Sequence, residues 1–139
     1  MQNITISTDK KKLQVNYIHE FLANESYWSK NIPLDVVLRA IDGSTCFGVY
    51  EGQRQIGFAR VITDHATFAY LADVFVDKAY RGKGVSKQLM QYIMDYQPLK
   101  GLRSVMLATL DAHKLYEKFG FKALKEPERY MSIKFFESY

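Results

Sequence analysis

The chain of 139 residues is 47% apolar, 24% charged and 14% aromatic, a composition typical of a folded globular protein that argues against a disordered one. Its formal net charge of +4 favours an anionic partner, but nucleic-acid-binding domains usually concentrate positive charge more strongly, so we expect no nucleic acid. No run approaches the roughly 20 apolar residues of a membrane span, and no signal-peptide core is present, so we expect a cytoplasmic protein without a membrane partner.

Residues that form disulfides or bind metals are sparse. The lone cysteine, Cys46, excludes an internal disulfide and a cysteine-based zinc site, and its apolar neighbours indicate a small buried side chain rather than a nucleophile. The three histidines are scattered without metal-ligand spacing, so we expect no metal. No repeat, low-complexity segment or linker divides the chain, which predicts one domain over residues 1–139.

Two helices are expected first. After possible N-caps at residues 8–9, apolar residues keep helical spacing over residues 13–22, and the lysines at 10–12 form a solvated first turn. Pro33 can open a second helix, which Asp42-Gly43 would end.

The middle of the chain changes to strand patterns. Three runs separated by the turns "EGQR" and "DH" predict an antiparallel meander at residues 45–50, 55–63 and 66–76. A helix is expected over 85–96, followed by a continuously apolar strand at 104–109 that would be buried on both faces.

The end of the chain adds one helix and one strand. Asp111 would cap a helix that ends at Gly120, and the tail "RYMSIKFF" would return as a strand. The element order ααβββαβαβ predicts an α+β fold, a mixed α/β sandwich around one central sheet. Strands 66–76 and 104–109, joined by a helix, would run parallel with a right-handed crossover if they are neighbours.

Between strand and helix lies the stretch "RGKG", residues 81–84. Its two glycines allow close approach to the main chain, and the first-turn amides of the following helix favour a negative charge. Flanking cations at Arg81, Lys83 and Lys87 make the junction suitable for a pyrophosphate. A Walker A loop is absent, and a Rossmann fingerprint would need a glycine where Lys87 stands. The alternative is an ordinary glycine turn with solvated cations.

Two motifs in order resemble the GCN5-related N-acetyltransferase (GNAT) superfamily. The segment "VFVDKAYRGKGVSKQL" is similar to its Arg/Gln-x-x-Gly-x-Gly/Ala signature at Arg81, Gly84 and Ser86, with Ser in the last position. The later segment "ATLDAHKLYEKFGF" is similar to its second motif, with Thr109 where Asn is usual; the matching residues are Ala112, Leu115, Tyr116, Gly120 and Phe121. The resemblance implies a mostly antiparallel central sheet, splayed between two parallel strands and flanked by helices on both faces.

The resemblance also implies acetyl-coenzyme A as co-substrate. Loop amides would hold its pyrophosphate, and main-chain groups of the preceding strand would pair with pantetheine in the slot between the splayed strands. Thr109 departs from the motif at a side chain that would otherwise hydrogen-bond the cofactor. The residues expected to bind the cofactor are Val74, Phe75, Val76, Arg81, Gly82, Lys83, Gly84, Val85, Ser86, Lys87, Thr109 and Ala112.

For amine acetylation, the motif implies that Tyr116 delivers the proton to the departing thiolate; the alternative is that Tyr116 is a core residue of its helix. A backbone amide near Val74 to Val76 would hold the oxyanion. Asp73, an acid inside an apolar run, is either a base acting through water or a structural hydrogen-bond acceptor. Strand alternation would point Tyr70 and Asp73 in opposite directions.

The acceptor would enter beside the N-terminal helices. Tyr27 and Trp28, in the loop between them, would line the substrate site together with Tyr70, or would instead plug the end of the sheet. A compact chain without a peptide-reading module favours a small primary amine over a protein lysine or N-terminus. The competing readings are a non-catalytic acyl-coenzyme A-binding domain and a nucleic-acid-binding domain. A homodimer is possible through the aromatic tail "KFFESY", or that tail finishes the sheet within one chain.

Overall fold

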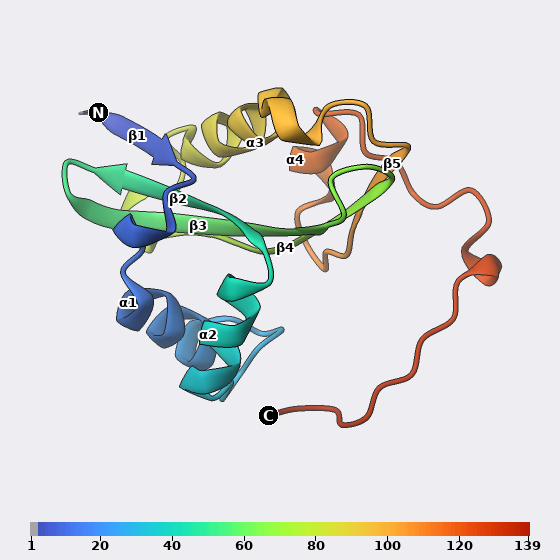
Figure 1. Ribbon diagram of the computed structural model, residues 1–139, viewed down its shortest axis with the longest axis horizontal. Coiled ribbons are helices and arrows are strands. Elements are labelled where there is room, and N and C mark those ends of the chain that lie inside the picture. Colours follow the sequence, from blue (N-terminus) through green and yellow to red (C-terminus); the bar gives the residue numbers. More distant parts are fainter. Residues whose placement is uncertain (1–2) are drawn as a thin grey trace.

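The computed structural model describes residues 3–139 and is built on one five-stranded sheet in the order β1-β2-β3-β4-β5 (Figure 1). The first four strands pair antiparallel, and β4 pairs parallel with β5. The strands are β1 (Ile4–Ser7), β2 (Thr45–Glu51), β3 (Arg54–Thr63), β4 (Phe68–Val76) and β5 (Ser104–Leu107). The meander of β2, β3 and β4 and the parallel crossover to β5 confirm the prediction.

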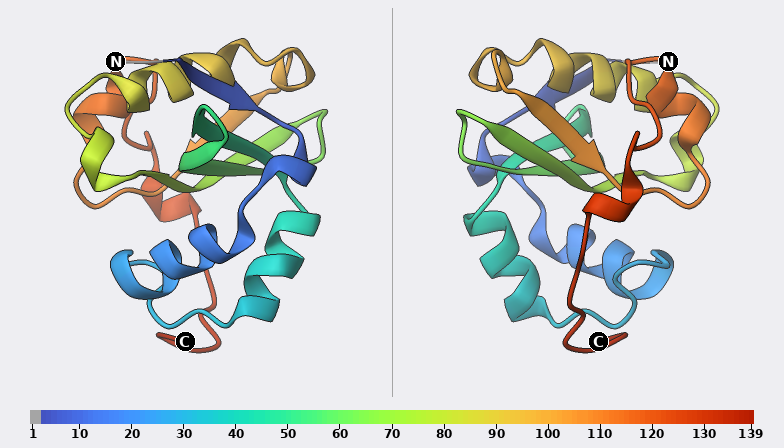
Figure 2. Two further views of the ribbon diagram at one scale, coloured as in Figure 1. Left: turned by 90° about the vertical axis from the view of Figure 1, so that its left-hand side faces the viewer. Right: turned by 90° about the vertical axis from the view of Figure 1, so that its right-hand side faces the viewer.

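Helices cover both faces of this sheet (Figures 1 and 2). One face carries α1 (Val15–Glu20), which continues into a π-helical turn (Phe21–Glu25), and α2 (Leu34–Asp42). The other carries α3 (Val85–Asp95) and α4 (His113–Glu117). The predicted α+β sandwich with helices on both faces is therefore confirmed.

The core has two parts, one on each face of the sheet. Leu89 and Met90 of α3 pack on Phe47 of β2 in one cluster, because the spacing of α3 turns its apolar stripe inward. Ile18 of α1 packs with Phe58 of β3 in the other. Burial of both sheet faces explains why the strands are apolar almost throughout.

The N-terminal region differs from the expectation. The first strand, β1, was not predicted, because four residues with only Ile4 and Ile6 alternating are too short a pattern to distinguish from a loop. The expected first helix is broken. Asp9 caps a separate 3-10 turn, Lys10–Lys12, by accepting a hydrogen bond from the amide of Lys11 (2.9 Å), and α1 begins only after it.

Two predictions for the C-terminal part are wrong. The strand at 104–109 is not buried on both faces: β5 is the edge of the sheet, with Ser104 exposed and the rest half-buried. The tail from residue 130 forms no strand and is exposed along its whole length. Among residues 3–139 no strand pairs with the outer edge of β5, which leaves this strand only half-buried.

Within the described residues, no helix combines the length and the apolar character needed to cross a membrane.

Candidate active site

The sheet opens where β4 leaves β5. Parallel pairing between the two strands ends at Leu71 and Leu107. On the other edge of β4, the register with β3 slips by one residue, because Phe58 faces Phe75 while Arg60 faces Ala72. The extra residue on β4 forms a bulge, and such irregularities bend a strand away from its neighbours. The edge of β4 that faces β5 is therefore left without a strand partner beyond Leu71.

Asp73 lies in this bulge with a positive φ of 54°. A non-glycine residue rarely adopts this left-handed conformation, which costs about 1–3 kcal/mol and persists only where surrounding contacts hold it. Here the contacts come from two distant side chains. Arg60 on β3 forms an ion pair with the carboxylate (Nε–Oδ2 2.5 Å), and the indole N–H of Trp28 donates to Oδ1 (2.7 Å).

A cleft of about 540 Å³ opens between β4, the end of β5 and the loop that follows α1. It brings together eight of the residues predicted for the site, from four separate parts of the chain. They are Tyr27, Trp28, Tyr70, Asp73, Val74, Thr109, Ala112 and Tyr116.

The aromatic pair in the loop after α1 crosses the cleft. The Tyr27 hydroxyl accepts a hydrogen bond from the amide of Leu110 (3.1 Å), beyond β5, and its ring lies edge-to-face against Trp28 at 5.0 Å. Trp28 is bonded in turn to Asp73 on β4. The loop is thus tied to both sides of the slot, and both rings stay partly exposed to it.

Tyr116 forms the inner wall of the cleft. Its side chain is only 8% exposed and packs edge-to-face on Phe121 at 5.9 Å. Burial, with smaller contributions from Tyr27 and Asp111, raises the pKa of its phenol to about 12. The hydroxyl therefore carries its proton throughout the neutral range. The Tyr116 side chain thus belongs to the core cluster and to the cleft wall at once.

The loop from β5 to α4 is organised by Thr109. Its hydroxyl accepts a hydrogen bond from the amide of Ala112 (3.0 Å), which begins the helix. Asp111 was expected to cap this helix, but Ala112 is the N-cap and no side chain caps it from that position. Thr109 thus uses its one hydroxyl locally, and Asp111 stays exposed on the cleft lining.

Tyr70 was expected to point away from Asp73, yet both line the cleft. Alternation of side chains holds only for a regular extended strand. The positive φ of Asp73 interrupts that regularity at the bulge. The alternation of side-chain direction along β4 therefore does not continue past Asp73.

The glycine loop lies beyond the C-terminal end of β4 and does not line this cleft. Gly82 and Gly84 have φ of 76° and 80°, so both occupy the left-handed region that glycine tolerates. Gly84 is the N-cap of α3, and its carbonyl accepts from the amide of Gln88 (3.1 Å). The first-turn amides, including those of Ser86 and Lys87, have no carbonyl partner within the helix and are available to an anion.

The other predicted loop residues take different environments. Arg81 is exposed and folds back, donating from Nε to the carbonyl of Val76 (3.1 Å), while Lys83 lies over the ring of Tyr80. Val85 is buried in the core, so only its backbone could meet a ligand. Phe75 also packs its side chain in the core, stacked on the ring of Phe21.

Sequence reasoning missed Arg60. The signal was available, because Arg60 and Asp73 are isolated opposite charges in otherwise apolar runs of adjacent strands, and buried charges are expected to pair. Leu107, Ala108 and Leu110 were also missed as cleft lining, since their place depends on where β5 ends.

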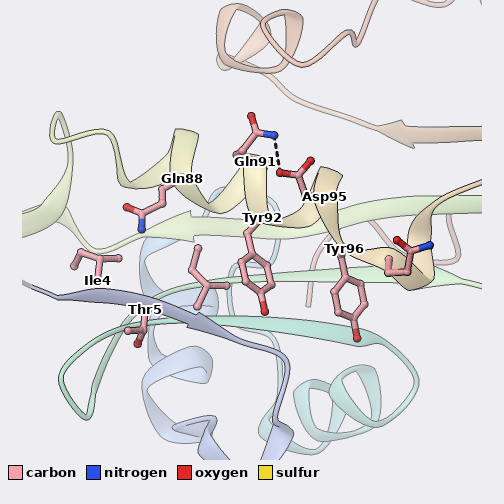
Figure 3. Close-up of a pocket in the computed structure, with 9 residues that line it drawn as sticks. Ile4, Thr5, Gln88, Gln91, Tyr92, Asp95 and Tyr96 are labelled. Carbon is pink, nitrogen blue, oxygen red and sulfur yellow. Dashed lines mark hydrogen bonds between the residues drawn. The ribbon is translucent and has the colours of Figure 1, made fainter.

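A larger cavity of about 820 Å³ lies between β1 and α3 (Figure 3). It holds none of the predicted site residues. Its single carboxylate, Asp95, accepts a hydrogen bond from the side-chain amide of Gln91 (2.9 Å), and the remaining lining is apolar, aromatic or amide apart from the hydroxyl of Thr5. Among residues 3–139, no cluster of three or more His, Cys, Asp or Glu could hold a metal ion. The titratable and aromatic side chains predicted for the site therefore gather at the β4–β5 cleft and not in this larger cavity.

Comparison with known proteins identifies the family of the chain. A profile described as "Acetyltransferase (GNAT) family" matches residues 15–121, and the chain belongs to that family. A crystal structure of a GNAT-family acetyltransferase candidate from Xanthomonas campestris is 48% identical; the match covers 96% of this chain and 94% of that one, with a TM-score of 0.93.

Curated relatives are similar over shorter stretches. An acetyltransferase candidate of Gibberella zeae is 32% identical over 142 residues, which cover 87% of this chain and 80% of that protein. Thialysine N-epsilon-acetyltransferase of Sus scrofa is 28% identical over 96 residues, which cover 63% of this chain and 56% of that enzyme. The protein is a transferase of the GNAT acetyltransferase family.

Proposed function

We propose that the protein transfers an acetyl group from acetyl-coenzyme A directly to the primary amine of a small molecule. The observation that carries this proposal is the unpaired edge of β4, which lies in one cleft with a buried, protonated Tyr116. An extended ligand can pair with such an edge as an added strand would, and it then runs past the phenol.

The glycine loop would hold the phosphates of the co-substrate. Amides of the first turn of α3, exposed by the left-handed Gly84, point toward solvent at the positive end of the helix dipole. Arg81, Lys83 and Lys87 are all exposed there and add mobile positive charge. The pantetheine arm would then follow β4 from the loop toward the bulge at Asp73.

Attack of the amine on the thioester carbonyl forms a C–N bond and breaks the C–S bond. The thioester supplies the activated acetyl group, and a main-chain amide at the bulge, near Val74, would stabilise the oxyanion. A Lys-like amine with pKa of about 10.4 is almost wholly protonated at pH 7, so the attacking molecule must first lose a proton.

Tyr116 would act mainly as a hydrogen-bond donor to the departing sulfur. Its pKa of about 12 lies above the roughly 8.5 of a thiol, so complete transfer of the phenolic proton to a free thiolate is uphill. The proton that finally resides on sulfur comes from the acceptor nitrogen, which sheds it once the C–N bond has formed. Donation from Tyr116 lowers the barrier because the negative charge on sulfur develops next to it.

Asp73 fits the role of a positioning residue better than that of a base. One carboxylate oxygen is paired with Arg60 and the other accepts from Trp28. Removing a proton from the amine would weaken both contacts. The same contacts hold the bulge and fix Trp28 at the cleft, which supports the structural reading of Asp73.

A small acceptor is supported by the cleft and by one relative. The cleft volume of about 540 Å³ must hold the acetyl end of the co-substrate as well as the acceptor, and Tyr27 closes one side through Leu110. The exposed carboxylate of Asp111 on the lining would attract a cationic amine. The Sus scrofa relative is named for a small amine, thialysine.

A thiol-release assay with acetyl-coenzyme A and a panel of small amines, lysine peptides and N-terminal peptides tests the proposal. We expect turnover with at least one small amine and a melting temperature raised by acetyl-coenzyme A. No thermal shift with acetyl-coenzyme A, and a clear one with an oligonucleotide, would contradict the proposal and favour the nucleic-acid reading. Turnover confined to peptides would overturn the small-molecule acceptor alone.

A further inference from the structure

The C-terminal tail carries the pattern of a half-buried strand but lies in solvent. Met131, Ile133 and Phe135 alternate with the polar Ser132 and Lys134. In an extended chain these three apolar side chains lie on one face, and they are 96%, 78% and 88% exposed. An exposed apolar face of this kind marks a surface that a partner can cover.

The same chain contains an empty place for a strand. Within the part of the chain that the structure describes, the outer edge of β5 has no strand neighbour. Beside it lies a groove of about 320 Å³, whose walls are β5 and its extension on one side and α4 with the segment 121–124 on the other. Its lining is largely apolar, with Val105, Leu107 and Phe121 among the side chains.

We propose that residues 130–136 of one copy occupy this groove in a second copy as an added strand beside β5, and that the exchange is reciprocal. Each chain then offers one open edge and one unpaired strand, so a two-fold dimer satisfies both at once. Backbone groups of β5 gain hydrogen bonds, and the apolar face at 131, 133 and 135 is covered.

The segment before the tail favours a second copy over the tail's own groove. To return beside its own β5, the chain would have to reverse direction after Leu124. Instead Glu126 has φ −136° and ψ 72°, Pro127–Arg129 form a 3-10 turn, and Tyr130 leaves it extended (φ −106°, ψ 131°). The tail then runs away from β5 toward the side of the sheet that carries α1 and α2 (Figures 1 and 2).

The exchanged strand would also support the catalytic cleft. The groove and the cleft share Leu107, Ala108, Thr109 and Tyr116 in their linings. A strand from the partner would therefore pack behind Tyr116. This consequence rests on the proposed function, whereas the exchange itself does not.

Cysteine pairing between two chains tests the exchange without disrupting the protein. One tagged chain carries Met106→Cys on β5, and a differently tagged chain carries a cysteine at 131, 133 or 135, so neither chain can form the bond alone. The native Cys46 is buried and adds no background. We expect a disulfide joining the two tags for at least one tail position.

Two cross-linking results would contradict the exchange. A chain carrying both cysteines that forms the bond within itself, at monomer mass, would show that the tail closes its own groove and overturn the proposal. A dimer in which no tail position couples to residue 106 of the other chain would overturn it too, since another surface would then make the dimer.

Light scattering on the full-length protein provides the second measurement. The wild type is expected at twice the mass of one chain, and Ile133→Asp with Phe135→Asp should shift it to the mass of one chain. Lys134→Glu, on the opposite strand face, is the matched control and should remain dimeric. A wild type at monomer mass at the concentrations of the assay would overturn the exchange.

Discussion

The glycine loop and the β4–β5 cleft differ in the groups that they offer to a ligand. The loop offers main-chain amides, and its shape depends on two positive φ angles within residues 82–84. The cleft instead offers side chains that come from a loop after α1, from two strands and from α4. A site made of local backbone is encoded in a few consecutive residues, whereas a site made of distant side chains depends on the whole fold.

This difference predicts how the two regions respond to substitution. The loop should tolerate changes of side chain but not the loss of a glycine, because the backbone conformation does the binding. The cleft should be sensitive to the removal of single atoms, such as the Tyr116 hydroxyl, while its backbone is unaffected. Three substitutions and one pH profile, taken from the largest expected effect to the smallest, test that contrast.

Gly84→Val should have the largest effect. A β-branched residue at φ 80° is strained by about 1–3 kcal/mol, so the chain leaves this conformation and the first-turn amides turn away. Loss of two charge-assisted hydrogen bonds, about 3 kcal/mol together, lowers acetyl-coenzyme A affinity by about 100-fold. Calorimetric titration measures the affinity for acetyl-coenzyme A.

Gly101→Val is the matched control. Its φ of 83° imposes similar strain, and an added Cβ meets no heavy atom within 4 Å at either position. It lies before β5, away from the loop, so it should reduce stability similarly and leave coenzyme affinity unchanged. Equal affinity in the two variants would place the pyrophosphate elsewhere.

Tyr116→Phe should lower kcat by about 10- to 1000-fold and leave acetyl-coenzyme A affinity nearly unchanged. The loss falls on kcat because the hydroxyl acts on charge that develops in the transition state. The ring still packs on Phe121, so the fold should persist. Single-turnover kinetics must accompany the steady state, so that slow product release does not mask the effect.

Tyr50→Phe is the control for removal of a buried phenolic oxygen. Within the described residues, the Tyr50 hydroxyl is buried without a hydrogen-bond partner, and it lies outside the cleft. Its loss should not reduce kcat. Wild-type single-turnover rates in Tyr116→Phe would make Tyr116 a core residue only.

Elements with strong local patterns could be predicted from the sequence. The helix opened by Pro33, the meander and the glycine loop are each specified by consecutive residues, and each lies where it was expected. The second motif likewise placed Tyr116 on a helix beside the cleft. Family membership, confirmed by the matching profile, rested on these two local motifs.

What could not be predicted depends on pairing between distant residues. The bulge at Asp73 is a slip in register between β3 and β4, and nothing in either strand alone shows it. Its consequence for direction, the shared orientation of Tyr70 and Asp73 toward the cleft, was missed for that reason. The tail has a strand pattern, but a pattern cannot specify which edge it will pair with.

Asp73→Asn should act mainly on stability. Arg60, mostly buried, loses its ionised partner, so the free energy of unfolding should fall by about 1.5–3 kcal/mol. Catalysis should fall by less than in Tyr116→Phe, with the shape of its pH profile unchanged. Asp35→Asn breaks an exposed pair with Arg39 and should have little effect on stability. A loss of about 10²-fold or more in kcat for Asp73→Asn, at full stability, would make Asp73 the base.

The smallest expected effect is that the pH profile of kcat/KM has no descending limb near pH 10. An unperturbed phenol is half deprotonated near pH 10, so a donor of that kind would impose a descending limb there. Burial disfavours the phenolate and raises the pKa of Tyr116 to about 12, so the donor form persists at pH 10. The value of kcat/KM should therefore rise with the neutral fraction of the acceptor amine and level off near the pKa of that amine.

Two acceptors with pKa values of about 8 and 10 test this expectation. A plateau set by the amine moves with the pKa of the acceptor, whereas a plateau set by an enzyme group does not. A descending limb near pH 10 that is shared by both acceptors and missing in Tyr116→Phe would show that the phenol titrates normally, and that the cleft around it is open to water.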